Sequence, residues 1–412
     1  MTNTTTVMIH VDALRHDYVT AEDMPFLHSL AQQGVSGSII PPFGFEPDGA
    51  YFTGRTPEEY EGGVHFVFSP DTTPYRFARF LPDWFDRLGP YVSYAFRHYI
   101  VEPFIRRFAA HDRVRVQSYI GRIPFRQLPF FDLGDKEYAY EEGAFNGYPT
   151  LFDLLKKAGV DCFYHGAPQW PVRMGAVTER VLREYKGDEP FLFLFCGDLD
   201  VVGHKAGPDS AERRVVSRQV DEGLRRIHEH LESFGGAVEW LIFGDHGMAE
   251  VTQGVDVGAA LKSLPVKQGK DYACFLDSTF ARFWFFNDHA REVIEPVVRA
   301  LPGGTVISDQ DQADYEIRYK TRKFGDLVFW VDEGAEVHPD YWHFRGMKKG
   351  MHGYREEVRD NHAAFICTGA DATGCGALAS PVIMQDLFAT AVAMLNLEKP
   401  EGSGGTPLWK KA

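Results

Sequence analysis

Short apolar runs alternate with segments of helical periodicity along most of this chain. Runs of five or six residues predict buried strands at 6–11, 35–40, 160–164, 191–196 and 238–243. Helical spacing of apolar residues predicts helices at 24–33, 150–158 and 210–233. Later in the chain we expect strands at 281–286, 327–331 and 363–368, and helices at 289–300 and 382–395. Such alternation predicts an α/β fold with a mostly parallel sheet and helices on both faces.

The segment 64–148 has a different texture, because aromatic residues are interleaved with arginines and prolines break it into short helices. We therefore expect a catalytic α/β domain made of 1–63 and 149–412, with 64–148 as an aromatic-rich helical insertion that caps or lines a site. Two other interpretations stay open: ordinary packing of a small helical lobe, and a membrane-surface helix, although the prolines interrupt any long amphipathic face.

Charge and cysteine content narrow the class of protein. With 43 basic and 58 acidic residues the net charge is −15, which argues against a role as a nucleic-acid scaffold and favours a soluble protein. The five cysteines have no CxxC spacing, so neither a disulfide framework nor a thiolate zinc site is indicated. We see no secretory signal and no apolar run near the ~18 residues of a membrane span, and we expect a cytoplasmic protein.

Carboxylates and histidines cluster just after the predicted strands. They are Asp12, the pair Asp200 and His204, the pair Asp245 and His246, and His352 in a loop before the last strand. Carboxyl ends of parallel strands lie at one edge of a sheet, so we expect these groups to meet there. Nitrogen and carboxylate ligands without thiolate suit Zn²⁺, with Mn²⁺ or Fe²⁺ as alternatives, and six ligands suit two ions better than one. Singly, each residue has another reading: Asp12 as a helix N-cap, His204 as a surface histidine and His352 as a turn residue.

The order of these motifs resembles the alkaline phosphatase superfamily, in particular its type I phosphodiesterase and nucleotide pyrophosphatase branch. The motifs that carry the resemblance are Asp12, Thr53-Gly54, Asp200 to His204, Asp245 to Met248, and Gly350 to Gly353. The resemblance implies that Asp12, Asp245 and His246 hold one ion and that Asp200, His204 and His352 hold the other. Asp198 is a rival to Asp200, but the family's spacing to the histidine favours Asp200. A sulfatase is disfavoured, because the chain has no Cys-x-Pro-x-Arg segment.

The chain departs from this family at the nucleophile. A nucleophilic Thr or Ser is expected between Phe43 and Asp48, and no hydroxyl side chain stands there. Pro47-Asp48 occupies the place of the family's Pro-Asn, which puts the nucleophile at Phe45 or Glu46. Only Glu46 can do chemistry, so Glu46 and Asp48 are the candidate catalytic residues. We expect Thr53 to be structural.

The function expected from these features is two-metal hydrolysis of a phosphoric ester, acting on a small phosphorylated molecule as a phosphodiesterase or nucleotide pyrophosphatase. Glu46 or a metal-bound hydroxide would supply the nucleophile. Two alternatives stay open. One is a non-catalytic homologue that keeps the metals as braces and binds a phosphorylated ligand; the other is a phosphonate hydrolase or phosphotransferase.

Overall fold

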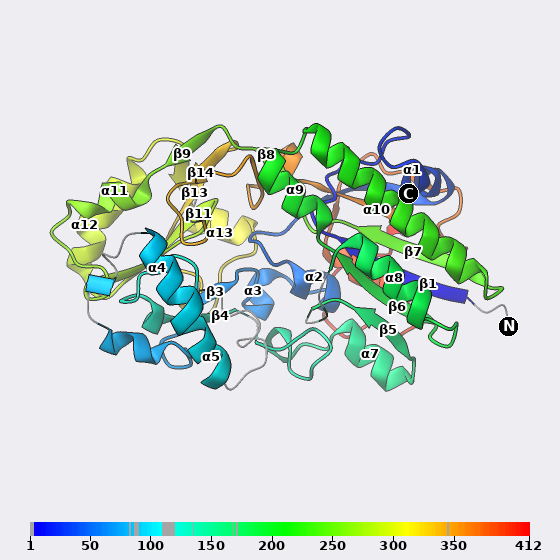
Figure 1. Cartoon of the computed structure of the whole chain (residues 1–412), viewed down its shortest axis with the longest axis horizontal. Helices are drawn as coiled ribbons and strands as arrows, with labels where there is room; N and C mark the ends of the chain where they lie inside the picture. The colour runs from blue at the N-terminus through cyan, green and yellow to red at the C-terminus, as the bar shows by residue number, and fades with distance from the viewer. Residues whose placement is uncertain are drawn as a thin grey trace.

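The computed structural model describes residues 4–81, 84–85, 90–108, 120–134, 136–167, 169, 172–343 and 346–412, in two lobes (Figure 1). Residues 82–83, 86–89, 109–119 and 135 of the predicted insertion lie outside this range. In the described part of the chain no helix is long and apolar enough to cross a membrane.

The first lobe is built on an eight-stranded sheet with the order β17-β2-β16-β7-β1-β6-β5, with β18 paired to β2. Its strands are β1 (Thr4–Val11), β2 (Val35–Ile40), β5 (Cys162–His165), β6 (Phe191–Cys196), β7 (Ala237–Phe243), β16 (Ala363–Cys367), β17 (Gly376–Ala377) and β18 (Val382–Ile383). All run parallel except β16, which is antiparallel to both β2 and β7. The predicted mostly parallel sheet is confirmed.

Alternation along the central strands supplies a core on each face of this sheet. In β1, Val7, Ile9 and Val11 pack on one face and Met8 on the other. The first face carries α1 (Pro25–Gln33), α8 (Met174–Glu184), α9 (Asp198–Ala206) and α10 (Ala211–Glu232). The second carries α2 (Asp48–Thr53), α3 (Pro57–Tyr60), α7 (Leu151–Ala158) and α14 (Gln385–Met394). Helices therefore cover both faces, as predicted.

The second lobe contains an antiparallel sheet with the order β10-β11-β13-β12. Its strands are β10 (Tyr272–Leu276), β11 (Phe280–Phe285), β12 (Gly304–Val306) and β13 (Leu327–Val331), and it is joined by α11 (Val257–Lys262), α12 (Asp288–Arg299) and α13 (Asp309–Asp314). The strands expected at 281–286 and 327–331 thus exist, but they lie outside the main sheet. Periodicity identifies a strand without identifying its neighbour, because pairing depends on contacts between distant segments.

Much of the segment 64–148 packs on this second sheet. It forms β3 (Phe66–Phe68), β4 (Phe131–Leu133), α4 (Pro90–Phe96) and α5 (Glu102–Phe108), and most of its described buried apolar residues share one hydrophobic core with β10, β11 and β13. Two short pairs complete the lobe: β14 (Ala335–Val337) with β9 (Gln253–Val255), and β15 (Gly350–Met351) with β8 (Ala249–Glu250). The division into a catalytic domain, 1–63 and 149–412, and an insertion, 64–148, stays a prediction.

Candidate metal centre and catalytic site

The three carboxylates of the predicted metal site stand at the ends of adjacent strands. Because β7, β1 and β6 are neighbours, Asp245 after β7, Asp12 after β1 and Asp200 in the first turn of α9 after β6 reach the same edge. This is the crevice in which open α/β sheets bind ligands.

The three histidines come to the same edge from different segments. His204 is one turn after Asp200 on α9, and its Nε2 lies 3.0 Å from Oδ1 of Asp200. His352 follows β15, with Nε2 3.7 Å from that same oxygen. Nε2 of His246 lies 3.4 Å from Oδ1 of Asp12 and 3.3 Å from Oδ2 of Asp245. The structure thus brings together all six side chains that sequence reasoning selected.

The two predicted halves of the centre are in contact. The rings of His246 and His352 stack with centroids 3.5 Å apart and an interplanar angle of 4°. By distance alone, the donor atoms fall into one group of Asp200, His246 and His352 and another that contains Asp12 and Asp245. His246 therefore stands at the boundary of the two groups.

Motif glycines make this convergence possible. A Cβ on Gly203 would lie 2.9 Å from Cε of Met248, and one on Gly350 would lie 2.9 Å from Cγ of the same methionine. Met248 therefore fills the space between these two glycines, and a larger residue at either position would force the Met248 side chain to move. His204 and His246 are oriented by their Nδ1 atoms, which lie 2.8 Å from the carbonyl oxygens of Gly350 and Gly247, so that each Nε2 faces the centre.

His10 is a site residue that sequence reasoning missed. It is the one polar residue inside the apolar part of β1 and stands two positions before Asp12, so both point to the same face. Its Nε2 lies 3.1 Å from Oδ1 of Asp245, and together with Asp12 these groups form a cluster of possible ligands. A histidine interrupting a buried strand just before a strand-end aspartate was the available signal.

The tautomer of His10 follows from its neighbours. The Tyr51 hydroxyl donates its single proton to Oδ1 of Asp48 at 2.6 Å, so it accepts at 3.1 Å from Nδ1 of His10. Nε2 of His10 then faces the carboxylate of Asp245, and this buried nitrogen has no hydrogen-bond partner among the described residues. Its position makes Nε2 available as a ligand beside Asp12 and Asp245.

Protonation states of the centre also suit a cation. Burial raises the pKa of Asp12 well above its ordinary value, and the charges of Asp245 and Asp200 add to the rise. Burial lowers the pKa of His352, and so do the imidazoles of His246 and His204, which keeps His352 neutral and able to ligate. Burial would raise the pKa of Asp200, but the adjacent His204 and His352 outweigh it and hold the pKa below its usual range. Oδ1 of Asp200 is buried without a hydrogen-bond partner in the described chain. The residues therefore fit two divalent ions.

Asp198, the alternative ligand to Asp200, is engaged in contacts with the start of α8 and the residue before it. Its Oδ2 accepts the backbone N–H of Met174 at 2.6 Å, at the start of α8, and it lies 3.5 Å from Nη1 of Arg173. Thr53 is also occupied, since it is 1% exposed and its hydroxyl donates to the carbonyl oxygen of Gly49 at 2.5 Å. Neither side chain is directed at the centre.

Glu46 lies at the junction of two cavities that flank the centre. One, of about 260 Å³, is lined by His10, Asp12, Asp245 and aromatic side chains; the other, of about 390 Å³, is lined by His204 and His352. Glu46 lines both, and Asp48 lines the first. Oε1 of Glu46 lies 2.6 Å from Nδ1 of His65.

The loop that carries Glu46 is held by one carbonyl. The backbone N–H groups of Phe45 and Glu46 both donate to the oxygen of Gly63, at 2.8 and 3.2 Å. Gly44 has φ = +112°, and a Cβ there would lie 1.9 Å from the same oxygen. Only glycine allows this approach, so the loop geometry places Glu46 at the centre.

The described walls of these two cavities carry no lysine or arginine side chain. Asp12, Glu46, Asp48 and Asp245 line the smaller one. No described arginine of 64–148 lines either cavity, and Arg122 and Arg126 line a different one. The aromatic residues of 64–148 do contribute, since Tyr138 and Phe145 line the smaller cavity.

Comparisons with known proteins agree with this arrangement. Residues 6–355 match the family described as type I phosphodiesterase / nucleotide pyrophosphatase. The chain is 25% identical over 252 residues to the mouse ectonucleotide pyrophosphatase/phosphodiesterase family member 7, covering 60% of this chain and 50% of that protein. It is 25% identical over 201 residues to human family member 5, covering 46% of this chain and 39% of that protein. The chain thus spans about half or less of the curated relatives it matches.

Solved structures show the same fold. Human ectonucleotide pyrophosphatase/phosphodiesterase 5 aligns with a TM-score of 0.71 and 16% identity, over 97% of both chains. An inactive threonine-to-alanine variant of the murine protein, in complex with AMP, aligns with a TM-score of 0.68 and 17% identity, over 98% of this chain and 97% of that one.

Proposed function

Since the chain belongs to the type I phosphodiesterase and nucleotide pyrophosphatase family, we propose that it is a two-metal hydrolase of a phosphodiester or pyrophosphate bond in a small molecule. Family membership agrees with the branch of the alkaline phosphatase superfamily that the motifs indicated. The metal dependence, the ligand set and the role of Glu46 are our proposals.

The observation that carries the proposal is the charge of the site. A phosphoryl group is anionic, yet the walls of the smaller cavity present four carboxylates and no described lysine or arginine. Such a pocket repels its substrate unless cations are held there. Asp12, Asp245 and His246, with His10 beside them, would hold one ion, and Asp200, His204 and His352 the other; Zn²⁺ fits best, with Mn²⁺ or Fe²⁺ as alternatives. When bound, the two ions neutralise the phosphoryl oxygens and activate the attacking and leaving groups.

We propose that Glu46 takes the place of the missing hydroxyl. Its position at both cavities and the His65 imidazole beside it support this role. The carboxylate either attacks phosphorus itself, forming an acyl phosphate and expelling the leaving oxygen, or accepts the proton of an attacking water. Trapping during turnover separates these: hydroxylamine converts an acyl phosphate of Glu46 into a hydroxamate at that residue and releases phosphate, whereas a Glu46 that acts only as a base is recovered unmodified.

Aromatic walls indicate the kind of ester. Phe45, Phe52, Tyr138, Phe145 and Phe193 surround the smaller cavity. They can stack on a base or enclose an apolar group, while a small monoester would leave them exposed to water. We therefore propose that diesters or pyrophosphates with an aromatic or apolar group are better substrates than small monoesters. The AMP in the complex of the inactive murine variant carries an aromatic base of the kind that such walls can stack on.

The test is metal content measured together with turnover. Full-length protein purified without chelator should contain close to two zinc, manganese or iron atoms per chain by elemental analysis, and should hydrolyse at least one member of a panel of phosphodiesters, pyrophosphates, monoesters and phosphonate esters. His204→Ala should lose about one ion and most of the activity. His289→Ala, an exposed histidine on α12, is the matched control and should change neither. No bound metal, together with no rise in thermal stability on adding zinc, would refute the proposal.

A non-catalytic homologue remains the second candidate, because the segment 43–48 lacks a hydroxyl side chain. That protein would retain two metals and bind a nucleotide, but would turn over no member of the panel. A phosphonate hydrolase or phosphotransferase would appear in the same panel, as preference for the phosphonate ester or for transfer to an added alcohol. The cytoplasmic location also stays a prediction.

A further inference from the structure

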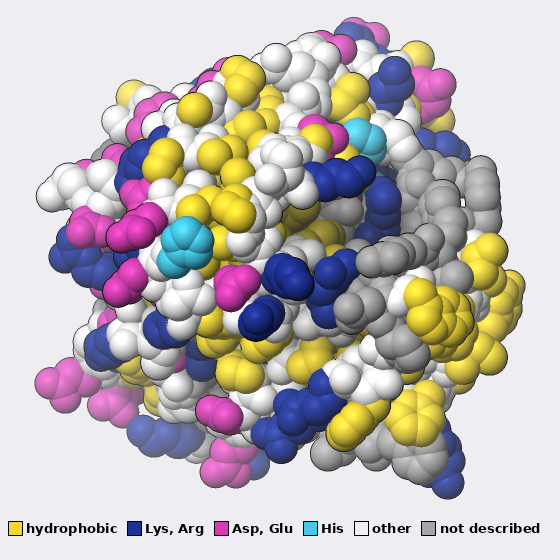
Figure 2. All heavy atoms as spheres, turned by 90° about the vertical axis from the view of Figure 1, so that its left-hand side faces the viewer, with side chains coloured by type: hydrophobic (Ala, Val, Ile, Leu, Met, Phe, Trp, Pro, Cys, Tyr) yellow, Lys and Arg dark blue, Asp and Glu magenta, His cyan; other side chains and the backbone are white. Residues whose placement is uncertain are grey.

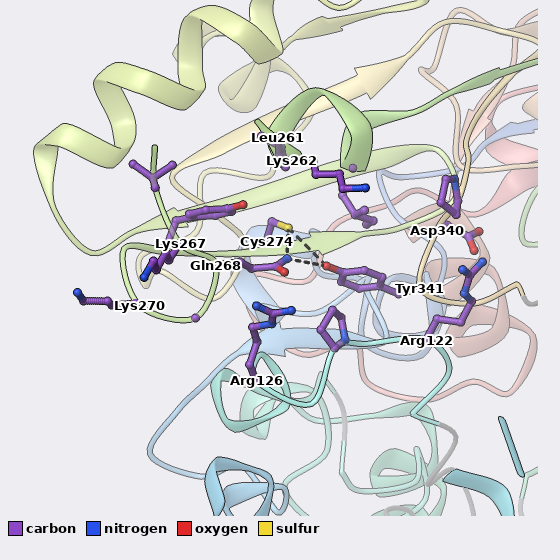
Figure 3. A pocket seen from close by; sticks show the side chains of 17 residues that line it. Arg122, Arg126, Leu261, Lys262, Lys267, Gln268, Lys270, Cys274, Asp340 and Tyr341 are labelled. Atoms are coloured by element: carbon purple, nitrogen blue, oxygen red, sulfur yellow. Dashed lines mark hydrogen bonds between the residues drawn. The ribbon is translucent and has the colours of Figure 1, made fainter. Parts of the chain in front are cut away.

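A large cavity of about 830 Å³ opens on the second lobe, and it shares no lining residue with the two cavities at the metal centre. Figure 2 shows lysine and arginine side chains gathered around a hollow on this face, and Figure 3 shows the lining residues from close by. None of the candidate metal ligands lines it, nor does Glu46. The catalytic proposal does not use this cavity.

Its walls concentrate positive charge in a chain whose net charge is −15. The basic side chains are Arg122, Arg126, Lys262, Lys267 and Lys270, and they come from three segments of the chain. For the three lysines the structure records no carboxylate within ion-pair distance among the residues it describes. The three lysine charges therefore stand on the same cavity wall as two arginines and have no ion-pair partner in the described chain, an arrangement that a bound anion would stabilise.

Nearby carboxylates are engaged elsewhere. Asp340 is the one acid in the described lining. Its Oδ1 accepts the backbone N–H groups of Trp342 and His343. Its Oδ2 accepts the Ser278 hydroxyl at 2.8 Å and lies 2.6 Å from Nδ1 of His343. Asp271 accepts the backbone N–H of Lys267 at 2.8 Å. Both carboxylates hold the backbone rather than the lysine ammonium groups.

The turn that presents two of the lysines is built into the fold. Its backbone closes through Lys270 N–H to the Lys267 oxygen at 3.1 Å and Gly269 N–H to the Tyr272 oxygen at 2.7 Å. Gly269 has φ = +82°, and a Cβ there would lie 3.2 Å from the carbonyl oxygen of Arg126. Glycine thus allows the turn to lie against the segment of Arg126, which brings lysines and arginine to one wall.

A rigid polar floor lies beneath these charges. Gln268 donates to the Tyr341 hydroxyl at 3.0 Å (Figure 3). Gln127, which is buried, donates to the same hydroxyl at 2.6 Å. The Gln127 side-chain oxygen accepts the backbone N–H of Cys274 at 2.7 Å. Leu261 and Val266 supply apolar wall next to this floor. A pocket with fixed polar groups, apolar wall and several cations has the character of a small-molecule site.

We infer that this cavity is a second ligand site, which binds a phosphorylated small molecule with at least two negative charges. A dianion or polyanion matches the number of cations better than a monoanion does, and guanidinium groups bind phosphate through paired hydrogen bonds. The volume accommodates a nucleotide or a phosphorylated sugar, and the concave shape suits a small molecule better than a flat membrane or a polymer backbone.

Calorimetric titration of the full-length protein with methylenediphosphonate, a diphosphate that cannot be hydrolysed at its bridge, tests this inference. At 150 mM salt, Lys267→Glu/Lys270→Glu should weaken binding at least tenfold. Lys156→Glu/Lys157→Glu on α7 carries the same charge change on the first lobe and should bind like the parent. Because the proposed metal centre can also bind a diphosphonate, each titration is repeated in the His204→Ala background. The binding that depends on Lys267 and Lys270 should persist there, which separates this site from the metal centre and from the proposed activity. Circular dichroism confirms that each variant is folded.

A Lys267→Glu/Lys270→Glu variant that binds methylenediphosphonate as tightly as the parent would overturn the assignment. The parent protein is then mixed with phosphatidylserine vesicles and with single-stranded DNA, and we expect neither to bind at 150 mM salt. If the parent binds vesicles or DNA but not the diphosphonate, and the Lys267→Glu/Lys270→Glu variant loses that binding, the partner is a membrane or a nucleic acid and not a small molecule.

Discussion

Removing the Tyr51 hydroxyl should weaken the metal centre without touching a candidate ligand. This hydroxyl links Asp48 to His10, and Nε2 of His10 faces Asp245 at 3.1 Å. Burial and the charge of Asp48 raise the pKa of Tyr51 well above its ordinary value, so the phenol keeps its proton over the working pH range. Tyr51→Phe leaves the ring in place and deletes only the link.

The magnitude follows from the two hydrogen bonds. The bond to the Asp48 carboxylate is charge-assisted and contributes about 1.5–3 kcal/mol, while the bond to the imidazole contributes about 0.5–1.5 kcal/mol. Some water replaces them at the edge of the cavity, so we expect the free energy of unfolding to fall by about 2–3 kcal/mol. His10 then loses the acceptor that holds its Nδ1 proton, and its ring is free to turn. Changes to groups that orient metal ligands typically reduce metal affinity about 10–100-fold, and we expect the same range for zinc here.

The assay combines urea denaturation with zinc titration against a competing chelator, for the parent, Tyr51→Phe and Tyr75→Phe. Tyr75 is a matched control, because it is fully buried in the second lobe and its hydroxyl has no hydrogen-bond partner in the described part of the chain. Tyr75→Phe should change the unfolding free energy by less than about 0.5 kcal/mol and leave zinc affinity unchanged. If Tyr51→Phe binds zinc as tightly as Tyr75→Phe, then His10 has no part in holding the metal.

Three further outcomes can be measured directly. Glu46→Gln should lower kcat at least a hundredfold in steady-state assays. Asp48→Asn should lower kcat less than tenfold, because an amide oxygen can still accept the hydrogen bond from the Tyr51 hydroxyl. Full activity of Glu46→Gln would place the chemistry on another residue. Arg282→Met should lower the unfolding free energy by about 3–5 kcal/mol in urea titrations, since it strands the fully buried Asp277 carboxylate 3.0 Å from the lost guanidinium; a loss below about 1 kcal/mol would contradict this. Burial raises the pKa of Asp277 to about 6, above its unfolded value, so the native state binds an extra proton and the free energy of unfolding falls as pH rises from about 4 to 6. Asp277→Asn should flatten that part of the plot of stability against pH. An unchanged slope would show that another group titrates.

Local patterns were sufficient for the main sheet and for most of the candidate site. A strand in the centre of a parallel sheet is apolar on both faces, and its carboxyl end must meet the ends of its neighbours. Asp12, Asp200 and Asp245 could therefore be assigned to one edge before any coordinates were known, and the structure places them there. His204 follows Asp200 by one helical turn, so its proximity was also a local property.

Contacts between remote segments could not be predicted from these local patterns. The antiparallel pairing of β11 with β13 joins strands more than forty residues apart, and no period in either strand names its partner. The link from Asp48 through Tyr51 to His10 depends on α2 packing over β1. Burial of His10 was visible from its apolar neighbours, but its role depends on which groups surround it in three dimensions.

The arginines and aromatics of 64–148 show the same limit. Composition indicated one lobe serving one site, yet the fold sends Tyr138 and Phe145 to the catalytic cavity and Arg122 and Arg126 to the cationic cavity of the second lobe. The chemical properties of a side chain follow from its residue type, whereas the cavity that the side chain lines is determined by long-range packing of the chain. The residue types therefore indicated the family and the proposed reaction class, and only the packed lobes separated a cavity lined by carboxylates from one lined by lysines and arginines.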